Sequence, residues 1–81
     1  MFIIMTATAK MPNSCWGRYM RVAVVETDGT RPKMISERAR GVVRIVQTWE
    51  RRNASTRGPN TAFARATREA ADLVAKLNGE Q

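Results

Sequence analysis

The sequence contains no histidine, one cysteine and no apolar run near the roughly 18 residues that a membrane-spanning helix needs. Without histidine, the chain lacks the commonest general base and a common metal ligand. Cys15 alone can form neither an internal disulfide nor a cysteine zinc site, which suits a reducing compartment. Neither a glycine-rich phosphate loop nor a carboxylate cluster for magnesium occurs. We therefore expect a cytoplasmic protein that is not an enzyme, carries no cofactor or metal, and does not bind a membrane.

The 81 residues are enough for one domain. The chain opens with an apolar run that is too short for the core of a signal peptide. We interpret residues 1–15 as a flexible N-terminal segment and residues 16–81 as a single small α+β domain. The alternative for the first segment is a strand over residues 2–8 that pairs with the next strand.

Residues 16–27 give the clearest strand signal, because they combine valines with a tyrosine. Both faces of this strand are partly apolar, so neither face is expected to be fully wet. Residues 28–30, Asp-Gly-Thr, then predict a turn. A single strand cannot satisfy its own backbone groups. It needs the N-terminal segment, residues 33–35 or the same strand of a second subunit as its partner.

Residues 36–53 fit two interpretations. Wound as a helix, they place most apolar side chains in one stripe, and Ser36 is suited to the N-cap. Read as a strand, they are rich in β-branched residues, and Gly41 would weaken a helix by about 1 kcal/mol. Because apolar and polar residues do not alternate strictly, we interpret the stretch as an amphipathic helix with Trp49 in its buried stripe.

Residues 61–78 predict a second helix, with Asn60 or Thr61 as its N-cap and Gly79 at its C-terminal end. Its expected buried stripe consists of Phe63, Ala66, Ala70, Leu73, Val74 and Leu77. Arg65, Arg68, Glu69, Asp72 and Lys76 are expected on the wet face.

The preferred fold is one strand or a short hairpin near residues 18–27, followed by two antiparallel helices. The alternative is a three-stranded antiparallel sheet, near residues 19–27, 33–39 and 42–51, covered by the C-terminal helix. The candidate core consists of Val22, Val24, Ile35, Val42, Ile45, Val46, Trp49, Phe63, Ala66, Ala70, Val74 and Leu77. So small a core favours a homodimer that buries more surface.

The formal net charge is +7, and most of the excess lies between Arg18 and Arg57. Most of these basic residues are arginines, whose planar guanidinium suits phosphate groups. We therefore predict a non-catalytic protein that binds nucleic acid through an arginine-rich face. The residues predicted to bind are Arg18, Arg21, Arg40, Arg44, Arg51, Arg52 and Arg57.

Two alternatives stay open for these arginines. They can form a solvated basic face with no ligand, or dock on an acidic protein surface of a larger complex. In the second case the protein would be an accessory subunit or inhibitor, for example one encoded by a phage or mobile element. The predicted order of strand, helix and helix is also that of ribbon-helix-helix DNA-binding proteins. That likeness is one of order only, because the link from Thr27 to Ser36 is longer and the strand lacks a row of polar base-reading residues.

Overall fold

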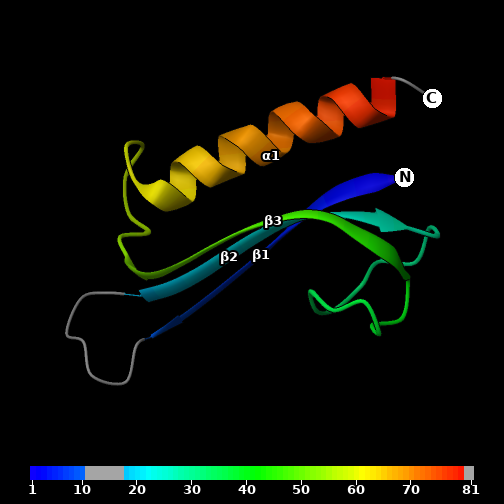
Figure 1. Cartoon of the computed structure of the whole chain (residues 1–81), viewed down its shortest axis with the longest axis horizontal. Helices are drawn as coiled ribbons and strands as arrows, with labels where there is room; N and C mark the ends of the chain where they lie inside the picture. The colour runs from blue at the N-terminus through cyan, green and yellow to red at the C-terminus, as the bar shows by residue number, and fades with distance from the viewer. Residues whose placement is uncertain (11–17, 80–81) are drawn as a thin grey trace.

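The computed structural model describes residues 1–10 and 18–79. It contains strands β1 (Phe2–Lys10), β2 (Arg18–Thr27) and β3 (Val42–Ala54), followed by helix α1 (Ala62–Gly79). The strands form one antiparallel sheet in the order β1-β2-β3. Helix α1 crosses one face of the sheet, and the loop of residues 28–41 lies on the other side (Figure 1). We refer to these two sides as the helix face and the loop face.

The central strand β2 is buried on both faces. Val22 and Val24 point to the helix face, where Phe2, Met20, Ala66 and Ala70 complete the core, and both are fully buried. Ala23 and Val25 alternate with them on the loop face and are also fully buried. This double burial explains why neither face of residues 18–27 is polar in the sequence. The predicted strand is thus confirmed over residues 18–27, while Trp16 and Gly17 lie outside the described residues.

The predicted helix over residues 36–53 is wrong, because most of this stretch is strand β3. The class given as the alternative, a three-stranded antiparallel sheet with a C-terminal helix, is the observed one. The strand, helix, helix order that suggested ribbon-helix-helix proteins is therefore absent from the described chain. The β-branched residues and Gly41 were the signals that indicated a strand here.

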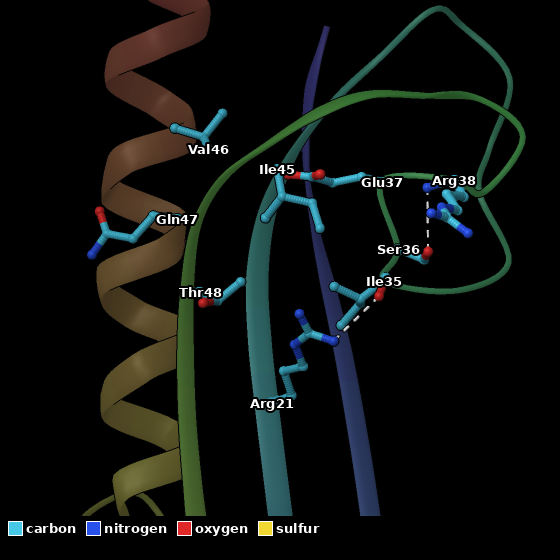
Figure 2. Close-up of a pocket in the computed structure, with 9 residues that line it drawn as sticks. All are labelled: Arg21, Ile35, Ser36, Glu37, Arg38, Ile45, Val46, Gln47 and Thr48. Carbon is cyan, nitrogen blue, oxygen red and sulfur yellow. Dashed lines mark hydrogen bonds between the residues drawn. The ribbon is translucent and has the colours of Figure 1, made fainter.

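Bulges in β3 explain why its sequence resembles an amphipathic helix. Val24 lies opposite Gln47 but Val25 lies opposite Ile45, so Val46 is an extra residue in β3. Figure 2 shows Val46 and Gln47 extending together to the helix side of β3, while Ile45 and Thr48 extend the other way. Such a bulge reverses the alternation of faces along the strand. Val46 and Trp49 therefore share the helix face although they are three residues apart.

Residues 33–39, the second strand of the alternative fold, belong instead to the loop of residues 28–41. The predicted turn at its start is present: the Thr30 backbone N–H donates to Asp28 Oδ1 at 2.9 Å. This hydrogen bond holds the pKa of the Asp28 carboxyl below its ordinary value. The Asp28 N–H donates to the Gly41 carbonyl at 3.1 Å and so closes the loop between β2 and β3.

The interpretation of residues 1–15 as a flexible segment is corrected for residues 2–10, which form strand β1. The strand alternative for this region is the observed structure, and residues 11–15 lie outside the described part. Phe2 is buried in the core beneath α1. Within the apolar run at the chain start, Phe2 is buried and the next three residues are half-buried.

Helix α1 agrees with the prediction. The Thr61 hydroxyl accepts a hydrogen bond from the Ala64 N–H at 3.1 Å, which identifies Thr61 as the N-cap. The expected stripe is buried or half-buried, and the five expected wet residues are exposed. Within the described chain, no helix has both the length and the apolar character required to cross a membrane.

We predict that Gly41→Ala lowers the free energy of unfolding by about 2–4 kcal/mol. Gly41 has φ 93°, and an added Cβ would lie 2.4 Å from the Thr30 carbonyl oxygen. The left-handed backbone costs about 1–2 kcal/mol and the clash a similar amount. Gly29→Ala is the matched control, because Gly29 has φ 103° but open space around it. Urea denaturation should show a loss of only about 1–2 kcal/mol for Gly29→Ala; equal losses would contradict the clash at Gly41.

Candidate nucleic-acid interface

The antiparallel register collects basic residues at one end of the molecule. Here β1 ends, β2 begins, β3 ends and α1 begins (Figure 1). Arg18 at the start of β2 lies opposite Lys10 of β1 and opposite Ala54 of β3. We call this region the basic end, and it comprises Lys10, Arg18, Arg51, Arg52, Arg57, Arg65 and Arg68.

Two arginines of the basic end flank a hollow on the helix face. Arg51 from β3 and Arg65 from the start of α1 line this hollow of about 370 Å³, with Trp49, Met20 and Glu50 among the other lining residues. The hollow exists because α1 packs over β1 and β2 more than over β3. Both arginines are exposed, whereas the Trp49 side chain is half-buried. Part of the Trp49 side chain is therefore accessible in a hollow that both arginines also line.

The acidic residues near the basic end are engaged by neutral donors. The Trp49 indole Nε1–H donates to Glu69 Oε2 at 2.8 Å, and the Tyr19 hydroxyl donates to Glu50 Oε1. In the described chain, no ion pair forms within the basic end, and its seven cations outnumber these two carboxylates. Its positive charge is therefore compensated only in part by neighbouring side chains.

Four of the seven predicted binding residues meet at this end: Arg18, Arg51, Arg52 and Arg57. Arg44 lies at the opposite end of β3, where its Nε donates to Glu26 Oε1 at 3.0 Å in an exposed ion pair. Arg40 is exposed in the loop of residues 28–41 and lies in the field of Asp28. Arg44 and Arg51 do share the helix face, because their partners Glu26 and Met20 are six residues apart on β2.

Arg21 is placed apart from the other predicted residues, on the loop face. Figure 2 shows its guanidinium extending toward the loop, where Nη1 donates to the Ile35 carbonyl at 3.2 Å. Its Nε is buried and has no hydrogen-bond partner among the described residues. The groove around it, of about 580 Å³, is lined by loop residues 35–38 and by β3. This geometry identifies Arg21 as a contact that holds the loop against the sheet.

Sequence reasoning did not assign Lys10, Arg65 and Arg68 to the interface. The two arginines were recognised as part of the wet face of the helix, but their neighbours depend on how α1 lies on the sheet. Arg68 Nη1 donates to the Pro59 carbonyl at 2.9 Å, so it also holds the segment before α1. Lys10 reaches this end only because β1 pairs with β2. The sequence predicts the strand pairing only as an alternative for residues 2–8, and no sequence signal reveals its register or the position of α1 on the sheet.

Comparison with family models, curated proteins and solved structures finds no match to this chain. Among the described residues, no group of three or more histidine, cysteine, aspartate or glutamate side chains lies close enough to hold a metal ion.

We predict that Arg21→Met changes the free energy of unfolding by less than about 1 kcal/mol. The substitution removes the hydrogen bond to Ile35, but it also removes the buried Nε–H that has no partner. These two effects have opposite signs and similar size. Urea denaturation tests the stability, and nucleic-acid binding should stay unchanged. A variant that folds as well as the parent but loses binding would return Arg21 to the interface.

Proposed function

We propose that this protein is a non-catalytic nucleic-acid-binding protein of the cytoplasm and that its basic end contacts the phosphate backbone. The observation that carries the proposal is the convergence of seven basic side chains from all four elements and the loop before α1. Within the described residues, six of the seven form no side-chain hydrogen bond or ion pair: Lys10, Arg18, Arg51, Arg52, Arg57 and Arg65. Clustered free guanidinium groups favour polyanions.

The hollow beside Trp49 supports nucleic acid over a simple anion. Proteins that bind single strands combine cations along the backbone with an aromatic ring on which a base stacks. Arg51 and Arg65 supply the cations, and the half-buried Trp49 supplies the ring. Contact with phosphates also predicts affinity that falls steeply as the salt concentration rises.

The test is binding of the Arg51→Ala/Arg52→Ala variant to labelled single-stranded and duplex DNA and to single-stranded RNA. We expect affinity to fall on the order of tenfold, since each exposed charge contact contributes about 0.2–1 kcal/mol. The slope of log affinity against log salt should fall by about two. Fluorescence anisotropy over a salt series measures both quantities.

The matched control is Arg31→Ala/Arg38→Ala, which removes the same charge from exposed residues of the loop of residues 28–41. This control should keep most of the parent affinity. Equal losses in both double variants would indicate a general effect of net charge and would reject the basic end as the interface. If the parent forms no salt-sensitive complex with any of the three polymers, the nucleic-acid proposal is rejected in favour of an acidic protein partner.

A further inference from the structure

The backbone direction at the start of β1 can be read from its hydrogen bonds. The Phe2 N–H donates to Asn78 Oδ1 at 3.2 Å, and the Asn78 amide donates to the Phe2 carbonyl at 3.2 Å. Both backbone groups of Phe2 therefore point away from β2. The Met1 carbonyl points the other way, because it accepts from the Thr27 N–H at 2.8 Å.

Strand β1 consequently presents a regular row of outward backbone groups. Its register with β2 runs from Phe2 to Lys10 without a bulge, so the direction alternates at every residue. The residues whose N–H and C=O face outward are Ile4, Thr6, Thr8 and Lys10. No described element pairs with this edge. Asn78 occupies only its first position, that of Phe2.

The two edges of the sheet differ in how they are protected. Natural edge strands discourage pairing with other chains through charges, bulges and prolines. Strand β3 has bulges and carries Arg44, Glu50, Arg51 and Arg52. Strand β1 has no bulge and no proline, and its only charge is Lys10 at its end. Its edge is therefore open to strand addition.

The flank of α1 above β1 is also free of charge. Asn78 bonds to β1 and Glu69 bonds to Trp49 of β3, which fixes the two flanks of the helix. At about 100° per residue, Thr67, Ala71 and Val74 lie on the same flank as Asn78. Arg65, Asp72 and Lys76 lie on the flank of Glu69. Thr67 and Val74 are half-buried and Ala71 is exposed, so small uncharged residues border the β1 edge.

We propose that β1 pairs antiparallel with β1 of a second copy of this chain, giving a symmetric dimer with a continuous six-stranded sheet. A two-fold axis beside Thr6 places Thr6 opposite its copy and Ile4 opposite Thr8 of the second chain. An antiparallel edge is self-complementary under such an axis. Threonine pairs across strands also contribute favourably.

The same axis brings the two helices together. Asn78 of α1 is hydrogen-bonded to Phe2 of β1, so these two residues lie at the same level along the sheet. The rise per residue of a helix and that of a strand then place Ala71 near the level of Thr6. Because α1 packs over β1 and β2, each helix axis lies about 5 Å from the two-fold axis. The helices would then be about 10 Å apart, which is the separation of packed helices. The flanks with Ala71 would face each other.

The distribution of charge on the surface favours a second copy of this chain at the β1 edge over a strongly acidic or basic partner. Each chain carries a net charge of +7. The β1 edge nevertheless has no charged side chain from Phe2 to Ala9. The adjoining flank of α1, with Thr67, Ala71 and Val74, has none either. Two copies can thus approach along the side that minimises their repulsion. The inference is independent of the proposed function, since it uses none of the exposed arginines.

Sedimentation equilibrium tests the dimer first. We expect the full chain to show twice its 9.1 kDa mass at high micromolar concentration. Thr6→Pro should give a folded monomer, because it removes an outward N–H that β2 does not use. Ala7→Pro is the matched control: the Ala7 N–H points to β2, so this variant should lose much of its stability in urea. A parent protein that stays monomeric would overturn the proposal.

A second pair of variants tests the helix flank without altering β1. Ala71→Arg should give a monomer, since it places bulk and charge at the two-fold axis. Asp72→Arg adds more positive charge on the opposite flank and should leave the dimer intact. If Thr6→Pro and Ala71→Arg both fold and remain dimeric, the β1 interface is rejected. These experiments measure only the mass of the protein, so the dimer and the nucleic-acid proposal can fail independently.

Discussion

Strand β2 is buried on both faces, and this double burial determines where the other elements lie. Val22 and Val24 require a cover on one side, and Ala23 and Val25 require one on the other. Helix α1 supplies the first cover and the loop of residues 28–41 contributes to the second. The loop is held by the contact of Arg21 with Ile35 and by closure at Gly41. A strand buried in this way must lie at the centre, which leaves β1 and β3 as edges.

The two edges have different chemistry. Strand β3 combines bulges with charged side chains, and its C-terminal residues belong to the basic end. Strand β1 is regular and almost uncharged. Positive charge is therefore separated from the surface that offers unpaired backbone groups. A polyanion is favoured at one place and a second strand at the other, and Lys10 is the one residue that belongs to both surfaces.

Residues 36–53 show how local pattern and tertiary structure can disagree. A bulge that places Val46 and Gln47 on one side of β3 leaves Val46 and Trp49 three residues apart on one face, which is also a helical spacing. Strict alternation fails in such a strand for a geometric reason. The preference of its valines and isoleucine for strands, together with Gly41, correctly indicates a strand.

Local sequence signals predict helix α1, the strand over residues 18–27, the turn at Asp28 and the net positive charge. Each of these depends on neighbouring residues: a capping threonine, a run of valines, an Asp-Gly pair. Three further features depend on contacts between distant parts of the chain: residues 2–10 form a strand, Arg18 lies beside the end of β3, and Arg21 lies on the loop face away from the other arginines. Strand pairing joins residues far apart in the chain, and no local preference encodes its register.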